Sequence, residues 1–417
     1  MLQAALLAAL LPLAASTPAA ASPQTPPVAA SGATDPVGAD LVAEVDALVR
    51  KAFYAPARLA EVGWDEGVAR TRSTVARAPD AAARTAALRA LLALLRTSHT
   101  GYYPREDPAY WDLASIFEPV LARTCPKERT PALPVTGEAV GVFWRELAGR
   151  WFVGGLYAGG PAEQAGLLTG DEVLGADGRP FGPVAAFAGK AGSPVELEVR
   201  RTRDAPPLTV KVTPAAVRPA EALRQAVLSS YRVVPRGSRK LAYLRIWAWT
   251  SQEIQQAVQE GISRANAAGV DGYVLDLRDG WGGASPQYLS IFMREVPVLE
   301  RIGRDGAAQR LDSQLRKPAV VLVNGGTRSG KEALAHAIRK HGLARLVGER
   351  TAGAVVFGAP FCLSDGALLL LAVEDARVDG ERLEGRGVEP DVVVPWDLRH
   401  AAGKDPQLER ALTLLAP

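Results

Sequence analysis

The front of the chain carries apolar residues at helical spacing. Valines recur at intervals of three and four over residues 42–49, and leucines do the same over residues 88–95. Such spacing places apolar side chains on one face of a helix. Asp80 stands just before the second run and is expected to be its N-cap. We therefore expect an N-terminal helical region over residues 39–130.

The pattern changes over residues 131–214, where short apolar runs alternate with Gly and Pro turns. Runs of this length and spacing are typical of short strands. They lie at residues 140–143, 151–156, 195–199 and 208–212. The sequence therefore predicts a separate β domain over this stretch.

Residues 215–417 alternate between apolar strands and amphipathic helices. The strands are expected at residues 241–246, 272–277, 317–324 and 343–347, and the helices at 251–268, 287–294 and 332–341. Strands that are apolar throughout and separated by helices favour a largely parallel sheet covered on both faces. With the two regions before it, this α/β core makes the expected fold class multi-domain α/β.

The chain begins with an apolar run over residues 2–15, followed by small residues that suit a cleavage site. This pattern is typical of a secretory signal, although no Lys or Arg precedes it. We expect a signal peptide over residues 1–21 and a flexible leader over residues 22–38. The protein is then periplasmic or secreted without a stable membrane anchor, and the alternative is that the signal is not cleaved.

Charge and cysteine content limit the classes of partner and ligand that are expected. Lys and Arg number 48 against 45 Asp and Glu, without a long basic run, so nucleic acid is not indicated as a partner. No Cys/His cluster has metal-ligand spacing, so no metal site is expected. The two cysteines, Cys125 and Cys362, either pair or remain as buried thiols, and the sequence does not decide between these states.

The candidate chemistry centres on residues 324–332, with the sequence NGGTRSGKE. This segment follows a buried strand and precedes a helix, which puts Ser329 at the carboxyl edge of a parallel sheet, where ligands bind. A helix N-terminus there stabilises developing negative charge, so Ser329 is the candidate nucleophile. The segment also matches most of a phosphate-binding loop, but Glu332 replaces the Ser or Thr that would hold magnesium. A nucleotide binder is the less favoured alternative.

Glycines follow the neighbouring buried strand. Residues 276–283 read DLRDGWGG. Glycines let a substrate backbone approach closely and leave N–H groups free for an oxyanion. We expect the oxyanion hole to consist of the N–H group of Gly330 with that of Gly282 or Gly283.

These motifs in combination resemble the tail-specific (C-terminal-processing) protease family. The family shows DLR-x-N-x-GG, a serine on a strand-turn-helix, G-E-x-T-x-G and G-[IV]-x-PD. The counterparts here are residues 276–283, Ser329, residues 348–353 and residues 387–391. The resemblance implies a serine endopeptidase without a cofactor.

The β domain resembles a PDZ domain, on the Gly-Pro turn at residues 160–167 and the GDEVL strand at residues 170–174. Such domains capture an extended peptide as an added strand and hold its terminal carboxylate on backbone N–H groups. The expected peptide-binding residues are Gly160, Ala165, Gly166 and Leu167.

One departure from the family concerns the base. Many members use a Ser–Lys dyad, but Ala354 stands at the position of that lysine. A second branch, similar to the tricorn protease core, uses a Ser-His-Ser-Glu tetrad. Ser98, His99 and Glu384 occupy the corresponding places, which implies His99 as general base with Ser98 and Glu384 orienting it.

Two points stay open on the residues alone. Ser98 could instead cap a turn, and Glu389 or Asp391 could orient the imidazole in place of Glu384. The resemblance implies that the protein hydrolyses peptide bonds of exported polypeptides by acyl transfer. The missing dyad lysine, with Arg328 and Lys331 beside the serine, supports an alternative: a catalytically inactive member that only binds peptides. The sequence does not indicate the oligomeric state.

Overall fold

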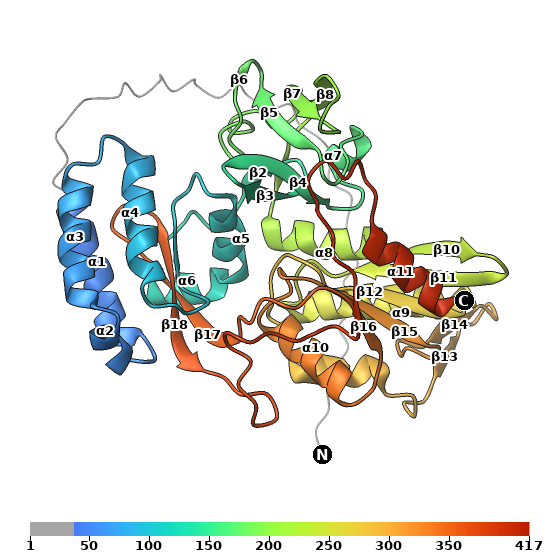
Figure 1. Cartoon of the computed structure of the whole chain (residues 1–417). Helices are drawn as coiled ribbons and strands as arrows, with labels where there is room; N and C mark the ends of the chain where they lie inside the picture. The colour runs from blue at the N-terminus through green and yellow to red at the C-terminus, as the bar shows by residue number, and fades with distance from the viewer. Residues whose placement is uncertain (1–36, 417) are drawn as a thin grey trace. The chain divides into compact units, whose positions relative to one another are not determined.

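The computed structural model describes residues 37–416, so the expected signal peptide and nearly all of the leader lie outside the described residues. Figure 1 follows the chain from the N-terminal helices in blue, through the green β domain, to the core sheet in yellow and orange. Within residues 37–416, no helix combines the length and the apolar character needed to cross a bilayer.

The N-terminal region is helical, as the apolar spacing predicted. The helices are α1 (Val37–Ala52), α2 (Ala57–Glu61), α3 (Trp64–Ala76), α4 (Ala81–Ala93), α5 (Pro108–Ile116) and α6 (Glu118–Thr124). Asp80 is confirmed as the N-cap of α4, because its carboxylate accepts a hydrogen bond from the backbone N–H of Ala83 at 2.8 Å. Buried apolar residues of α1, α3 and α4 share one core.

A three-stranded sheet completes this core, and the sequence pattern did not predict it. β1 (Gly101–Tyr103) pairs with β18 (Leu368–Asp375), which pairs with β17 (Val356–Cys362). Leu369 and Leu371 of β18 are fully buried among the helix side chains. The β17–β18 hairpin therefore packs with the N-terminal helices, although the sequence analysis placed it with the α/β core.

The middle of the chain forms a β domain around its own apolar core. Its sheet has the order β3-β4-β5-β7-β8, with β6 paired to β5. The strands are β3 (Val142–Leu147), β4 (Arg150–Leu156), β5 (Glu172–Ala176), β6 (Arg179–Pro180), β7 (Val195–Arg200) and β8 (Leu208–Val212). The short helix α7 (Pro161–Gln164) lies between β4 and β5, and β2 (Gly137–Ala139) pairs with β9 (Ala215–Val217). β3 stands at one end of the sheet order, with β4 as its only strand neighbour.

The C-terminal core contains a six-stranded sheet with the order β10-β11-β12-β15-β16-β19. Only β10 runs antiparallel to its neighbour, and the other pairs are parallel. The strands are β10 (Arg232–Arg236), β11 (Arg239–Arg245), β12 (Gly272–Asp276), β15 (Ala319–Val323), β16 (Arg345–Gly348) and β19 (Val392–Val393). A small hairpin, β13 (Leu299–Ile302) with β14 (Ala308–Leu311), follows the 3-10 helix η1 (Pro286–Phe292).

Helices cover both faces of this sheet. On one face, alternate strand residues are buried with side chains of α8 (Pro219–Ser230), α9 (Gln252–Ala267) and α10 (Gly330–Lys340). On the other face, the intervening strand residues pack against α11 (Pro406–Leu415). The mixed α/β fold with several sheets agrees with the expected class.

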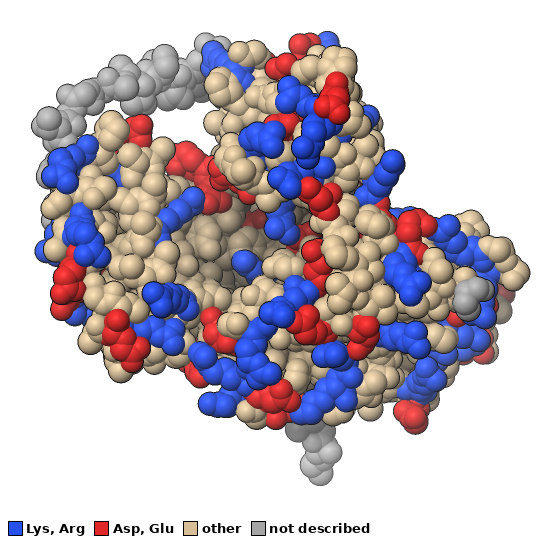
Figure 2. Space-filling model, in the orientation of Figure 1, with Lys and Arg blue, Asp and Glu red and all other residues tan. Residues whose placement is uncertain are grey.

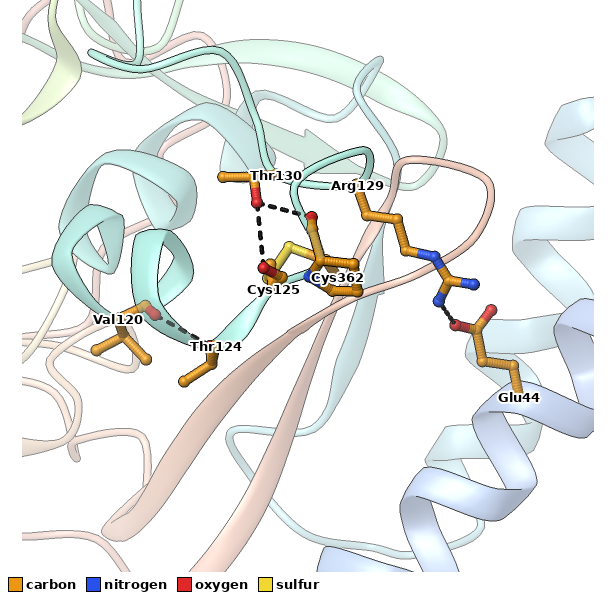
Figure 3. The surroundings of a disulfide bond; sticks show 8 residues. Glu44, Val120, Thr124, Cys125, Arg129, Thr130 and Cys362 are labelled. Carbon is orange, nitrogen blue, oxygen red and sulfur yellow. Dashed lines mark hydrogen bonds and ion pairs between the residues drawn. A yellow bond between two sulfur atoms is a disulfide. The ribbon is translucent and has the colours of Figure 1, made fainter.

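A disulfide joins Cys125, just after α6, to Cys362 at the end of β17, with their Cα atoms 5.7 Å apart (Figure 3). The pairing that the sequence left open is thus made. Beside it, Arg129 donates a hydrogen bond to Glu44 of α1 at 2.5 Å. The segment after α6 is therefore tied both to the β17–β18 hairpin and to α1.

Candidate active site

Ser329 lies on a sharp turn between β15 and α10. Its backbone has φ 56° and ψ −132°, a left-handed conformation that costs a non-glycine residue about 1–3 kcal/mol. The turn is held by Thr327, whose hydroxyl donates to the carbonyl of Leu277 at 3.0 Å and accepts from the N–H of Asn324. A strained serine between a strand and a helix is how hydrolases expose a nucleophilic hydroxyl.

The glycines expected near the serine lie against it. A Cβ added at Gly282 would overlap the Cβ of Ser329 and stand 2.9 Å from its Oγ. A Cβ added at Gly330 would likewise collide with the backbone of Ala284. Only glycine allows the two segments to approach this closely. Among residues 37–416, the N–H groups of Gly282, Gly283 and Gly330 donate no hydrogen bond. These N–H groups therefore have no acceptor in the described part of the chain, which the predicted oxyanion hole requires.

The three other predicted tetrad residues form one hydrogen-bonded chain. Glu384 accepts hydrogen bonds from the hydroxyl and the backbone N–H of Ser98, both at 2.8 Å. The Ser98 hydroxyl also lies 3.0 Å from Nδ1 of His99. Ser98 therefore does more than cap a turn, and Glu384 rather than Glu389 or Asp391 is joined to the imidazole. Glu389 instead pairs with Arg350, and Asp391 pairs with Arg339.

This chain is connected to the serine through two adjacent residues. Ser329 donates its backbone N–H to the carbonyl of Ala354 at 2.9 Å, and Val355 donates its N–H to Glu384 at 2.8 Å. His99 also lies against Gly358 of β17, where a Cβ would come within 2.9 Å of the histidine Cβ. Within the described part of the chain, no hydrogen bond joins His99 to Ser329. The structure thus connects Ser98, His99 and Glu384 to the segment that binds the backbone of Ser329.

The electrostatic surroundings keep His99 neutral. Burial is the largest cause that lowers the pKa of His99, to about 4, and the charge of Arg328 acts in the same direction. Glu384 opposes the shift. A neutral imidazole can accept a proton, which is the state that a general base requires.

Lys331 is not available to a ligand. Its side chain is fully buried, and Nζ donates to the carbonyls of Ile246 and Trp247, both at 3.1 Å, and of Asp279 at 2.5 Å. Burial lowers the pKa of Lys331 to about 7. In a phosphate-binding loop the lysine must reach the phosphates, so this geometry argues against the nucleotide-binding alternative.

Glu332 has a role that the sequence analysis missed, because its position was judged only as a mismatch to the phosphate-binding loop. Its buried carboxylate accepts from the N–H groups of Gly353 and Ala354 at 2.7 and 2.8 Å, and from the Thr351 hydroxyl. These contacts fix the loop whose Ala354 carbonyl binds the N–H of Ser329. Thr351 and Gly353 of the G-E-x-T-x-G motif make two of these contacts, but the motif itself does not include Glu332.

A cavity of about 900 Å³ lies beside the β domain, where Figure 2 shows the surface hollowed. It is lined by residues 136–142 and Trp144, by residues 183–188 in part, and by side chains of α5 and α8. Gly160 of the predicted peptide-binding set lines it, whereas Ala165, Gly166 and Leu167 do not. Leu167 is instead buried in the β-domain core.

Two side-chain contacts that the sequence did not reveal tie neighbouring regions to the site. Asp112 of α5, which lines the cavity, accepts a hydrogen bond from Nε1 of Trp281 at 2.9 Å, and Trp281 precedes Gly282. Arg145 of β3 forms an ion pair with Asp279 in the segment that leads to these glycines. Among residues 37–416, no group of His, Cys, Asp and Glu side chains is arranged to hold a metal ion.

Comparison with known proteins finds sequence similarity to peptidases. Residues 240–394 match the family model described as "Peptidase family S41". The chain is 29% identical over 257 residues to the carboxy-terminal-processing protease of Bartonella bacilliformis, an alignment that covers 57% of each chain. It is 30% identical over 276 residues to the carboxyl-terminal-processing protease of Picosynechococcus sp., covering 62% of this chain and 64% of the relative. The matched part thus spans between 57% and 64% of these two relatives.

The fold has a counterpart among solved structures. The crystal structure of the tricorn protease matches 91% of this chain and 36% of its own with a TM-score of 0.52, at 18% identity. At that identity the match concerns the fold alone. The matched residues 240–394 include Ser329, Gly282, Gly283 and Glu384. Residues 240–394 of this chain thus match peptidase family S41, and 57–62% of the chain is similar to carboxyl-terminal-processing proteases.

Proposed function

We propose that this protein is a serine endopeptidase in which Ser329 is the nucleophile and His99 the general base. The observation that carries the proposal is the hydrogen-bonded chain Glu384–Ser98–His99, which reaches the segment that also binds the backbone of Ser329. A serine hydroxyl is a weak nucleophile at its ordinary pKa and needs an adjacent base. In this site a neutral imidazole, held in one tautomer by a hydroxyl and a carboxylate, supplies it.

The reaction would follow the acyl-transfer sequence. Ser329 Oγ attacks the substrate carbonyl carbon while its proton passes to Nε2 of His99. The tetrahedral oxyanion binds the free N–H groups of Gly330 and of Gly282 or Gly283. His99 then protonates the leaving amine, and water hydrolyses the acyl-enzyme with the same base. Each oxyanion donor is worth about 3 kcal/mol of barrier in such sites.

Substrate binding would complete the contact between base and nucleophile. His99 and Ser329 share no hydrogen bond in the described chain, and catalytic hydrogen bonds commonly tighten only in the complex with substrate. Ser98 fixes Nδ1 of the ring, which leaves Nε2 as the nitrogen that can face Ser329. A movement that brings Nε2 of His99 to Ser329 Oγ would then complete the pair.

We further propose that the β domain is a PDZ domain that captures extended or C-terminal segments of the polypeptide. β3 is an end strand of its sheet, and Val142 and Trp144 of β3 line the cavity. An extended peptide could pair with that strand, as in other cases of strand addition. The Asp112–Trp281 hydrogen bond links the cavity wall to the oxyanion glycines, which supports delivery of the peptide toward Ser329.

The proposed location is the periplasm or the exterior. The disulfide between Cys125 and Cys362 supports this location, because structural disulfides persist mainly in oxidising compartments. The apolar start of the chain supports it independently. Exported polypeptides are therefore the proposed substrates.

Labelling with a fluorophosphonate probe tests the nucleophile. The wild-type protein should be labelled and should cleave an unfolded protein substrate, and Ser329→Ala should do neither. Ser193→Ala is the matched control, since Ser193 is exposed and its hydroxyl makes no hydrogen bond in the described chain. Peptide binding by an unlabelled wild-type protein would instead support the inactive, peptide-binding alternative.

A further inference from the structure

Arg328 occupies the position directly before the proposed nucleophile. Its side chain is half-buried, and its guanidinium carbon lies 5.8 Å from the centre of the Trp281 ring. After the dominant effect of burial, its charge contributes to lowering the pKa of His99, and it opposes the burial that raises the pKa of Tyr103. The guanidinium therefore lies near Trp281 and acts electrostatically on both His99 and Tyr103.

Apart from the Trp281 ring, this cation has no partner in the described chain. Within residues 37–416, no carboxylate lies within 4.0 Å of the Arg328 guanidinium, and it donates no hydrogen bond. The nearby arginines differ, because Arg145 and Arg278 each pair with an aspartate. A guanidinium carries five donors and no acceptor, and partial burial without a partner is costly. The site thus holds donors that an incoming anion can satisfy.

We propose that Arg328 is a specificity-determining residue that binds a carboxylate of the substrate close to the scissile bond. The inference rests on the proposed peptidase function, because it concerns the substrate of that same site. An edge of the planar guanidinium carries N–H groups that match a carboxylate with two parallel hydrogen bonds. That carboxylate belongs either to an Asp or Glu side chain or to the free C-terminus of the polypeptide.

A bound carboxylate would also raise the basicity of His99. The positive charge of Arg328 is one of the causes that hold the pKa of His99 low. Pairing that charge with an anion removes this contribution, so the imidazole becomes a stronger proton acceptor when the preferred substrate is present. Acidic substrates would then gain in the chemical step as well as in binding.

Internally quenched peptides test the inference in two arms. The first arm compares Glu with Gln at each position beside the cleaved bond, and the second compares a free C-terminal carboxylate with its amide. In wild type we expect one arm to favour the carboxylate by roughly tenfold to a hundredfold in kcat/KM. Arg328→Ala and Arg328→Gln should lose most of that ratio while the fluorophosphonate probe still labels them. The matched control is Arg301→Ala, because Arg301 is exposed on β13 and has no ion-pair partner in the described chain.

The outcomes separate this inference from the proposed function. Loss of preference in the first arm identifies a side-chain carboxylate, and loss in the second identifies the terminal one. A wild-type protein without either preference, or variants that keep it, would overturn the inference while leaving Ser329 as nucleophile. If wild type is neither labelled nor active, the proposed function is wrong. Affinities of Glu and Gln peptides for Ser329→Ala, with and without Arg328→Ala, then still decide whether Arg328 binds carboxylates.

Discussion

Replacing Ser98 with Ala tests whether the hydrogen-bonded chain orients the base. The change removes the hydroxyl that joins Glu384 at 2.8 Å and Nδ1 of His99 at 3.0 Å. It leaves the backbone N–H of residue 98 and that of Val355 on Glu384, so the carboxylate keeps partners and the fold should persist. The expected damage is therefore to the tautomer and direction of the imidazole.

The size of the effect follows from the bonds lost. A hydrogen bond to a charged group is worth about 1.5–3 kcal/mol, and each 1.36 kcal/mol of barrier changes the rate tenfold. We expect kcat of Ser98→Ala to fall by roughly tenfold to a hundredfold with little change in KM, because the support matters most in the transition state. Removing the nucleophile of such a unit costs about a million-fold, so Ser329→Ala sets the floor.

The assay is steady-state cleavage of a quenched peptide, together with the rate of fluorophosphonate labelling. Thr97→Ala provides a matched control, because Thr97 also loses a hydroxyl with two hydrogen bonds but does not contact His99 or Glu384. If Ser98→Ala and Thr97→Ala both stay within about threefold of wild type, the chain does not orient the base and the reasoning fails.

Two further predictions follow from the same site. Gly282→Ala should fold but label far more slowly, because the new Cβ would overlap the Ser329 side chain and stand 2.9 Å from the Arg328 carbonyl; unchanged labelling would show that the oxyanion segment is not packed against the nucleophile. Burial lowers the pKa of His99 to about 4, whereas unfolded His99 titrates near 6.5, so the unfolded chain binds the proton first. The free energy of unfolding should therefore fall by at most about 3 kcal/mol as pH drops from 6.5 to 4, and the difference from His99→Gln, measured by urea unfolding, isolates this histidine.

Short sequence patterns predicted the elements of the fold that depend only on neighbouring residues in the chain. Short repeats of apolar residues, each only a few helical turns or one strand long, predicted the helices α1 and α4 and the buried strands β12 and β15. The position of Ser329 also follows, since a serine between β15 and α10 lies at the sheet edge by geometry alone. Such features need no knowledge of distant contacts.

Other features depend on pairings across long stretches of chain. β1 pairs with β18 through Gly101 and Leu370, a match that no local pattern encodes. The sequence analysis therefore missed this sheet, together with the packing of Gly358 against His99. The Gly-Pro turn pointed to Leu167 as a peptide contact, but the cavity lies beside β2 and β3 instead. A short motif thus does not show which of its side chains are exposed.

The placement of His99 depends on one long segment of the chain. This segment leaves the Ser329 turn at Ala354, whose carbonyl accepts a hydrogen bond from the N–H of Ser329. It then forms β17 and β18, packs on the N-terminal helices, and returns at Glu384, which binds Ser98. The β17–β18 hairpin packs against His99 and leads to Glu384, which binds Ser98. His99, Ser98 and Glu384 are therefore held together as one structural unit. Their position relative to Ser329 then depends on Ala354 and Val355, where this segment begins. Glu332 fixes the start of the segment by accepting a hydrogen bond from the N–H of Ala354.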